Sequence, residues 1–365
     1  MIQDARWVLS GLVACVPLVL ASRGPFLEQV SNATWIFGND LWNVTQEAVY
    51  ASKLYLRGSE LVGSATGHYM GYDGENNFAW TSAAITSRGK DYIDVGFSCN
   101  EGELHWVIFD DLAGAYQYFV NRALRDISIL RTLWRLDPDL FLNGRTYLRD
   151  QTLPDFSLYQ NATKVQDETW QLANGTFLTK YDFSDYVRER DFYGIYGPKV
   201  GSWYMHPGTD YHNSDHLSQT LTSRTRHTSA SGEKIAQPAD KIWGPWLWYL
   251  CFQNDGDVKN AETKAREELA KWPYPWLKDP AYQSRGGVTG QLRLSDGRPA
   301  SGAAIFLGET DTTRRPSVQG RNYYYTTQAD AEGRFSLQDV RTGTYGIHAW
   351  SNGGAIYAVE GLHVG

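Results

Sequence analysis

One lysine and a group of histidines mark the part of the chain that is best equipped for chemistry. This segment runs from Thr179 to His216, with Lys180 near its start and both His212 and His216 near its end. Tyrosines and tryptophans, which commonly line sugar clefts, lie between them. The lysine and the last histidine are too far apart for one helix face, so only the tertiary fold can bring them together.

A second candidate group is a pair of arginines on a predicted strand from Leu130 to Leu136. Because side chains of a strand point alternately to opposite faces, Arg131 and Arg135 are expected on the same face. Two arginines placed in this way could bind carboxylates. The alternative, which the spacing alone favours, is that both arginines pair with acidic residues of the sheet.

Carboxylates in the same region allow a different chemistry. Asp182, Asp185 and Asp210 could supply the two carboxyl groups of a glycoside hydrolase. Acidic residues are common in turns, however. The hydrolase interpretation also leaves Lys180 and the arginine pair without a role.

Length and composition restrict the class of protein. The chain has 365 residues, which is enough for two domains, and 14 Trp and 23 Tyr, which suits a β-rich protein that stacks on sugar rings. Its net charge of −7 excludes a general basic surface for nucleic acid. An acidic polymer would need local cations in the cleft.

The first residues predict export. Arg6 precedes an apolar run from Trp7 to Ala21, which has the length of a signal-peptide core and is short for a membrane span. We therefore expect a signal peptide at residues 1–22. A buried helix or an uncleaved anchor is the alternative.

Acceptor triplets and cysteines are consistent with a secretory route. Four Asn-X-Thr triplets begin at Asn32, Asn43, Asn161 and Asn174 and predict a secreted glycoprotein. Once Cys15 is removed with the signal peptide, Cys99 and Cys251 remain, either as a disulfide or as two thiols.

Short alternating segments predict a large antiparallel sandwich, with one helix at 257–271 and a loop at 138–157. A proline-bearing segment ends the first domain, so we expect a catalytic sandwich at residues 23–284 and a small β-sandwich at 285–365. The expected strands are 52–56, 91–97, 105–109, 116–120, 130–136, 170–181, 201–205, 242–252, 288–294, 303–307, 322–327, 333–337 and 343–350. The alternating tryptophans of the 242–252 strand are interpreted as core.

Several sequence motifs of the chain resemble those of the rhamnogalacturonan lyases of polysaccharide lyase family 4. They are residues 104–114, 131–137, 201–204, 287–290 and 343–350, together with Thr179-Lys180-Tyr181-Asp182 and Asn213-Ser214-Asp215-His216. The resemblance implies an all-β protein with a large mutarotase-like β-sandwich followed by a small fibronectin-III-like sandwich. It also implies an extracellular enzyme that cleaves the rhamnose–galacturonate linkages of rhamnogalacturonan I by β-elimination. The jelly-roll domain that normally follows in the family is expected to be absent.

The same resemblance implies roles for individual residues. Lys180 matches the catalytic base and His216 the active-site histidine that protonates the leaving oxygen, with Arg135, Arg131 or both at the uronate. Tyr211 matches an aromatic residue of the cleft, and Thr209 stands where a further tyrosine is expected. The alternatives are an ordinary surface lysine, a structural histidine, or a functional His206 or His212.

These residue roles determine which substrate, partners and cofactors we expect. Rhamnogalacturonan I, the pectin backbone, is the expected substrate, with no nucleic acid or membrane partner, and we expect a monomer. No organic cofactor is implied, and an amine base favours metal-independent chemistry, although calcium could bind acidic loops structurally. The alternative functions are a catalytically impaired pectin-binding protein and the two-carboxylate hydrolase.

Overall fold

The computed structural model describes residues 24–364 except for 74–75, 128, 148, 167–168, 180–183, 187–191, 212–217, 221–226, 229–234, 253–257, 315, 317–318 and 352–353. The predicted signal peptide at residues 1–22 lies outside the described residues. Among the helices that the structure describes, none combines the length and the apolar character needed to cross a membrane.

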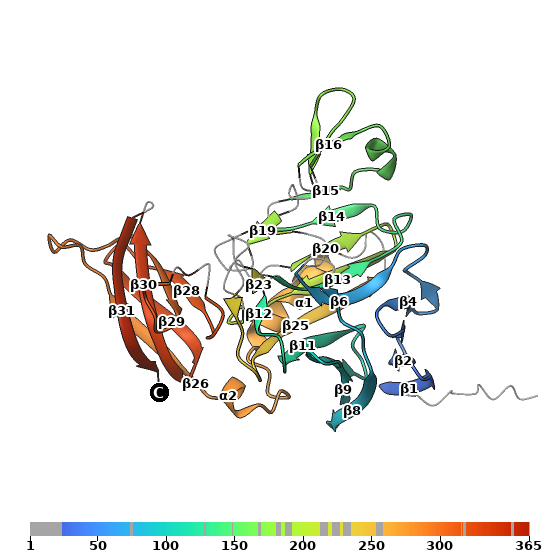
Figure 1. Ribbon diagram of the computed structural model, residues 1–365, viewed down its shortest axis with the longest axis horizontal. Coiled ribbons are helices and arrows are strands. Elements are labelled where there is room, and N and C mark those ends of the chain that lie inside the picture. Colours follow the sequence, from blue (N-terminus) through green and yellow to red (C-terminus); the bar gives the residue numbers. More distant parts are fainter. Residues whose placement is uncertain are drawn as a thin grey trace, which may run out of the picture.

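The expected all-β fold class is confirmed, and its main part is a sandwich of two nine-stranded antiparallel sheets (Figure 1). The first sheet has the order β1-β2-β3-β4-β6-β13-β23, with β5 paired to β4 and β7 to β6. Its strands are β1 (Phe26–Ser31), β2 (Thr34–Gly38), β3 (Trp42–Gln46), β4 (Ala51–Leu56), β5 (Ser59–Glu60), β6 (Gly67–Tyr72), β7 (Asn76–Asn77), β13 (Ile129–Arg135) and β23 (His227–Thr228).

The second sheet has the order β15-β14-β20-β21-β25-β11-β10-β9-β8. Its strands are β8 (Ser82–Arg88), β9 (Tyr92–Ser98), β10 (Gly102–Phe109), β11 (Gly114–Asn121), β14 (Asn143–Arg145), β15 (Asp150–Thr152), β20 (Phe192–Tyr196), β21 (Val200–Met205) and β25 (Ile242–Phe252). Strand β25 lies in the middle of this sheet, between β21 and β11.

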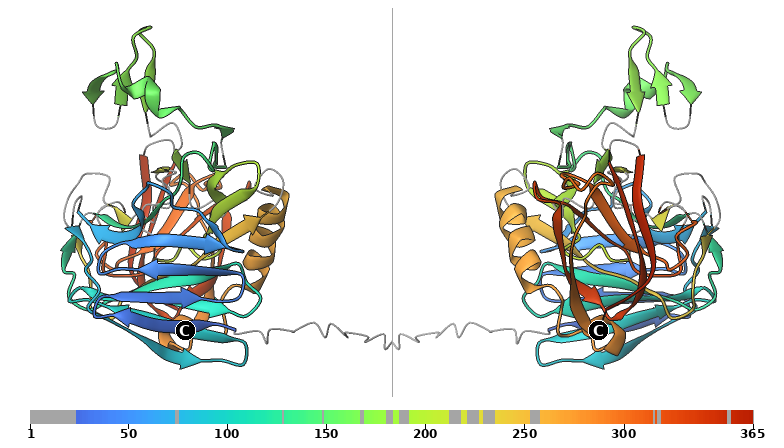
Figure 2. Two further views of the ribbon diagram at one scale, coloured as in Figure 1. Left: turned by 90° about the vertical axis from the view of Figure 1, so that its right-hand side faces the viewer. Right: turned by 90° about the vertical axis from the view of Figure 1, so that its left-hand side faces the viewer.

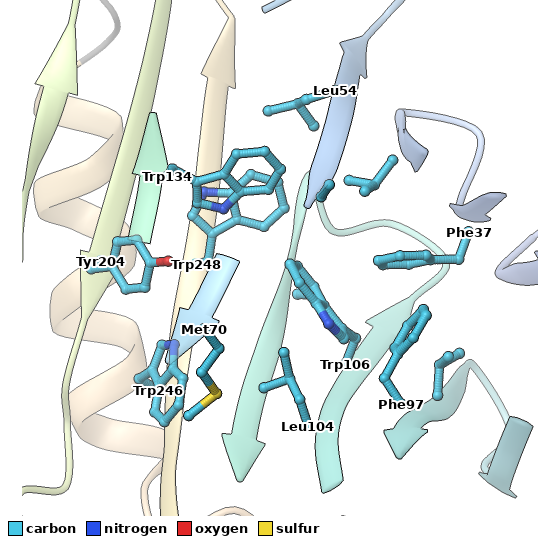
Figure 3. Packing of buried hydrophobic residues seen from close by; sticks show 14 of the residues in the cluster. Phe37, Leu54, Met70, Phe97, Leu104, Trp106, Trp134, Tyr204, Trp246 and Trp248 are labelled. Atoms are coloured by element: carbon cyan, nitrogen blue, oxygen red, sulfur yellow. The ribbon is translucent and has the colours of Figure 1, made fainter. Parts of the chain in front are cut away.

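Tryptophans fill the space between the sheets (Figure 3). The indole of Trp134 from β13 stacks on that of Trp248 from β25, with ring centroids 4.8 Å apart. Trp42 and Trp106 meet Trp248 edge to face, at 5.4 Å and 5.8 Å. The polar end of Trp248 is satisfied because its Nε1 donates to Ser202 Oγ at 3.0 Å. The prediction that the tryptophans of β25 are core residues is confirmed.

The other face of the second sheet carries the predicted helix, α1 (Val258–Lys271), on the side away from the first strands of the chain (Figure 2). Ala261 and Ala265 pack on residues of β21 and β25, among them Trp203 and Leu247. Because alternate residues of β25 point to opposite faces, one strand serves both the inter-sheet core and the helix layer. A short helix, α2 (Pro280–Gln283), follows.

The prediction of a loop at 138–157 was wrong in part, because β14, β15 and the start of a 3₁₀ helix (Phe156–Tyr159) lie there. Three-residue strands are too short to show an alternating pattern. A three-stranded sheet then projects from the sandwich (Figure 1), formed by β16 (Thr163–Gln166), β17 (Thr169–Gln171) and β18 (Phe177–Thr179). Two further pairs are β12 (Asp126–Ile127) with β24 (Ile235–Ala236), and β19 (Ser184–Tyr186) with β22 (Ser218–Thr220).

The C-terminal part has its own hydrophobic cluster, which includes Ile305, Leu337 and Val340. Strand β26 (Arg285–Gln291) pairs with β29 (Arg334–Arg341), and a four-stranded sheet has the order β28-β27-β30-β31. Its members are β27 (Ala304–Gly308), β28 (Tyr325–Gln328), β30 (Gly343–Ser351) and β31 (Gly354–Val364). The domain limits stay a prediction, and we call residues 285–364 the second domain.

Both cysteines of the described residues are thiols, so the disulfide alternative is not what the structure shows. The Cys99 Sγ donates to the carbonyl oxygen of Gly102 at 3.4 Å. The Cys251 Sγ donates to Asn260 Oδ1 at 3.5 Å.

Replacing the central tryptophan is expected to destabilise the sandwich strongly. Trp248→Ala removes a fully buried indole that contacts both sheets, and we expect the free energy of unfolding to fall by about 3–5 kcal/mol. Denaturant unfolding followed by circular dichroism measures the change. Phe252→Ala, at the 39% exposed end of the same strand, is the control and should change stability by less than about 1 kcal/mol. Equal losses in both variants would contradict this assignment of the core.

Candidate active site

The arginine pair lies as the alternation predicts, on the face of β13 that points away from the inter-sheet core. Strand β13 pairs with β6 so that Arg131 is opposite Gly71, Leu133 opposite Tyr69 and Arg135 opposite Gly67. The ring of Tyr69 therefore lies between the two guanidinium groups. The Cζ atoms of Arg131 and Arg135 are 5.7 Å and 6.0 Å from the ring centroid. Arg135 Nη2 also donates to the Tyr69 hydroxyl at 3.4 Å.

The positive charge of this pair is not neutralised by the part of the chain that the structure describes. The ion pairs formed between described residues include neither Arg131 nor Arg135. Arg135 is exposed, whereas the buried Nε of Arg131 has no acceptor among the described residues. A buried donor without an acceptor is costly, whereas the exposed guanidinium of Arg135 can bind a carboxylate from solvent.

A buried chain of hydrogen bonds joins two tyrosines through a histidine. His206 Nδ1 is 2.6 Å from the Tyr211 hydroxyl, and His206 Nε2 is 2.9 Å from the Tyr193 hydroxyl. The Tyr193 and His206 rings are nearly parallel, with centroids 5.6 Å apart. Tyr211 packs on Trp246 at 6.1 Å and is 1% exposed. The predicted contact of Tyr211 with sugar stays a prediction, since in this structure its ring is part of the core.

Burial keeps this chain of hydrogen bonds neutral. Loss of solvation lowers the pKa of His206 to about 3 and raises the pKa of Tyr211 well above its ordinary value. A neutral imidazole has one donor and one acceptor nitrogen, so one tyrosine donates to His206 and the other accepts from it. With both nitrogens bonded and so low a pKa, His206 is poorly suited to protonate a leaving group. The alternative that His206 is the functional histidine therefore loses support.

The carboxylate of Asp210 is held inside an ion pair. Its Oδ2 is 2.8 Å from Arg341 Nε and 3.2 Å from Arg285 Nη2, and all three side chains are buried. Burial alone favours the neutral acid, but the charges of Arg341 and Arg285 outweigh it and lower the pKa of Asp210. An occupied, buried carboxylate cannot reach a substrate, which weakens the hydrolase interpretation. Asp182 lies outside the described residues, and for Asp185 only its place on β19 is described.

The two residues expected to do the chemistry, Lys180 and His216, lie outside the described residues. Lys180 follows Thr179, the last residue of β18, and His216 comes shortly before β22. Strands β19 and β22 pair in antiparallel fashion, with Asp185 opposite Gln219. The segments that follow Lys180 and His216 are therefore adjacent, but the meeting of the two side chains stays a prediction.

Sequence reasoning missed Tyr69 and Tyr193. Tyr69 meets the arginines only because of the register between β6 and β13, and the sequence carried no signal of that register. Tyr193 reaches His206 because β20 pairs with β21, with Phe192 opposite Met205. The alternating pattern places each tyrosine on a face but does not identify its partner.

Comparison with known sequences gives these groups a family context. The sequence model described as "Polysaccharide lyase family 4, domain II" matches residues 295–362. This match covers β27 to β30 and most of β31, and it confirms the expected fibronectin-III-like fold in this part of the chain. The resemblance of the chain to the rhamnogalacturonan lyases of polysaccharide lyase family 4 is therefore confirmed.

Individual relatives bear the corresponding name. The chain is 29% identical over 308 residues to "Rhamnogalacturonate lyase" of Dickeya dadantii, which covers 79% of this chain and 52% of the relative. It is 24% identical over 390 residues to "Probable rhamnogalacturonate lyase B" of Aspergillus terreus, covering 88% of this chain and 58% of the relative. The chain thus spans about half the length of the curated relatives it matches.

Comparison with solved structures adds little to the family assignment. A structure titled "Crystal structure of YidC from Thermotoga maritima" matches with a TM-score of 0.33 and 6% identity, over 68% of this chain and 58% of the other. A glycoside hydrolase of family 81 from Clostridium thermocellum matches with a TM-score of 0.30 and 11% identity, over 89% and 38%. Overlaps this weak carry no functional argument.

The buried histidine is expected to make stability depend on pH. The pKa of His206 is about 3 in the folded protein and about 6.5 in an unfolded chain, so its contribution is full above pH 6.5 and is lost as the pH falls towards 3. Between pH 6 and 4, the free energy of unfolding of the wild type should therefore fall more steeply than that of His206→Gln. The difference in slope should be about 1.4 kcal/mol per pH unit.

Urea unfolding at a series of pH values measures this slope. Tyr193→Phe is the matched control, because it removes a hydrogen bond to His206 but keeps the imidazole. Its slope should therefore equal that of the wild type. Parallel profiles for the wild type and His206→Gln would show that the imidazole is not buried in its neutral form.

Proposed function

We propose that the protein is a secreted lyase that cleaves the rhamnose–galacturonate linkages of rhamnogalacturonan I by β-elimination. The observation that carries this proposal is the pair of arginines on one face of β13, on either side of Tyr69, with no described acid to neutralise them. The names of the relatives point to the same polymer. The predicted signal peptide and the four Asn-X-Thr triplets support an extracellular location.

The reaction explains why two cations are needed. β-Elimination removes the proton on C5 of galacturonate and expels the oxygen on C4. Because the carboxylate next to C5 is already ionised, loss of the proton develops a second negative charge there. Fixed cations at this carboxylate stabilise that charge more in the transition state than in the ground state. Arg135, which is exposed, and Arg131, which is half-buried beside Tyr69, are assigned this role.

The proton transfers are assigned to Lys180 and His216 on the family resemblance. The base must be a neutral amine, and a free lysine has a pKa of about 10.4, so nearby arginines or burial would have to lower it. Histidine suits the acid because its ordinary pKa lies near working pH. With an amine base, we propose metal-independent chemistry, no organic cofactor, and a monomer that binds pectin.

The first experiment is a product assay. Purified protein is incubated with de-acetylated rhamnogalacturonan I, and the ultraviolet absorbance of the 4,5-unsaturated uronate product is followed. We expect a rise in absorbance in the wild type and a rate at least about a thousandfold lower in Lys180→Ala. A rise that survives Lys180→Ala would keep the lyase and remove Lys180 as its base.

The other outcomes of this assay decide between classes. Shortened saturated products without new absorbance would indicate a hydrolase. Folded protein that binds the polymer without any product would indicate the catalytically impaired binding protein. Either result overturns the proposed reaction.

The arginine pair is tested separately. Arg135→Gln is expected to lower kcat about 10²–10³-fold because the second charge on the carboxylate loses a cation, and Arg131→Gln should lower it as well. Arg334→Gln, an exposed arginine of β29, is the matched control and should keep wild-type kinetics. If both β13 variants keep the wild-type kcat, the uronate is bound elsewhere.

A further inference from the structure

A groove lies along helix α1, on the side of the second sheet that faces away from the first. Its larger cavity, of about 420 Å³, is lined by four aromatic residues and two lysines, namely Phe109, Tyr116, Tyr274 and Trp276 with Lys264 and Lys271. A smaller cavity of about 260 Å³ reaches Arg57 and Phe252. Asp111, Leu112 and Lys264 line both cavities, so the two form one surface, which we call the α1 groove.

The α1 groove is long enough for a chain molecule. Asn260, Lys264 and Lys271 of α1 all line it. Residues four, seven and eleven positions apart share one face of a helix, and eleven residues span about 16 Å. The larger cavity alone has the volume of an ordinary ligand site, which is about 300–1,000 Å³.

Trp276 gives one end of the groove an aromatic wall. Its ring is half-buried, and its centroid lies 5.2 Å from that of Tyr274 and 5.1 Å from that of Tyr116. The hydroxyls of both tyrosines donate to Glu268 Oε2, at 2.7 Å and 2.8 Å. Because the rings that support it are fixed in this way, Trp276 is a preformed platform for the apolar face of a sugar ring.

Two lysines lie beside this wall and keep hydrogen-bonding capacity. The Nζ atoms of Lys264 and Lys271 are each 3.2 Å from Glu268 Oε1. Glu267, which is half exposed, lies 3.8 Å from the first ammonium group and 3.9 Å from the second. An ammonium group has three N–H donors, so these contacts leave each lysine at least one donor for a ligand. The buried Glu268 thus holds two cations next to the aromatic wall.

The charged residues that line the groove are mostly basic. Arg57, Lys264 and Lys271 line it together with one acid, Asp111, although the whole chain has a net charge of −7. Cations attract an acidic ligand, whereas the aromatic wall needs an apolar surface. A polysaccharide in which a uronate is linked to a sugar with an apolar face meets both requirements.

We propose that the α1 groove is a second binding site for rhamnogalacturonan I, separate from the cleavage site. The methyl-bearing face of rhamnose packs on Trp276, and the carboxylate of galacturonate binds Lys264 and Lys271. The identity of the polymer rests on the proposed function. Arg131 and Arg135 lie on the outer side of the first sheet and α1 on that of the second, so the sandwich separates the two sites. A chain held in the groove raises the effective concentration of polymer at the cleavage site.

Affinity electrophoresis in gels that contain de-acetylated rhamnogalacturonan I measures the Kd of this site. Arg131→Gln combined with Arg135→Gln is the background, because it weakens the cleavage site and slows cleavage. We expect this background to be retarded by the polymer. Adding Trp276→Ala should raise the Kd about tenfold because the stacking surface is lost, and adding Lys271→Gln should raise it about threefold. A background that is not retarded, or an unchanged Kd in both groove variants, overturns the inference.

Controls separate the groove from general effects of charge and folding. Arg266→Gln removes a positive charge from the 67% exposed, opposite side of α1 and should leave the Kd unchanged. Lys271 is 51% exposed, so Lys271→Gln keeps the test decisive if Trp276→Ala fails to fold. Neutral galactan is the control polymer and should retard the background at least tenfold less. Equal retardation by galactan overturns the assignment of an acidic ligand.

Hydrogen–deuterium exchange locates the bound polymer. Peptides covering 109–116 and 272–278 should exchange more slowly when rhamnogalacturonan I is added to the background variant. Protection confined to peptides of β6 and β13 would place all binding at the cleavage site and overturn the inference.

The inference and the proposed function can fail separately. A wild type that yields no unsaturated product, with polymer binding lost in the groove variants, overturns the proposed function alone. A wild type that cleaves the polymer, with groove variants that bind as tightly as the background, overturns the second site alone.

Discussion

The structure depends on the stacking of Trp134 on Trp248 between the two sheets. Because the indole of Trp134 points into the core and alternate residues of β13 point to opposite faces, Arg131 and Arg135 must lie on the other face of the strand. The aromatic ring of Tyr69, from the neighbouring strand, then separates the two guanidinium groups. The position of the cations is therefore a consequence of core packing, and an arginine on this strand needs no acidic partner to hold its direction.

Two kinds of buried polar group occur, and they differ in charge. Within the sandwich, His206 and Tyr211 are neutral, because desolvation in an aromatic core makes ionisation too costly. At the contact with the second domain, Asp210 keeps its charge because two guanidinium groups compensate for the lost hydration. The neutral chain keeps local side chains in place, whereas the charged group holds together parts that are distant in sequence.

The sequence predicted the features that depend on local patterns. The alternation of residues 130–136 placed the arginines, the apolar spacing of 257–271 identified α1, and the tryptophans of β25 were correctly assigned to the core. Strands β14 and β15 were missed because three residues give no period. The Asp210–Arg341 contact could not be foreseen either, since the partners lie 131 residues apart and neither has a local signature. Lys180 and His216 stay predictions from family resemblance.

The separation between Asp210 and Arg341 has a consequence for the order in which the protein is made. A ribosome synthesises β25 and α1 before it reaches Arg285, and Arg341 emerges later still. Until then, the carboxylate of Asp210 lacks the two guanidinium groups that compensate for its burial. The contact between the two parts of the protein can therefore form only after the chain has been made as far as Arg341.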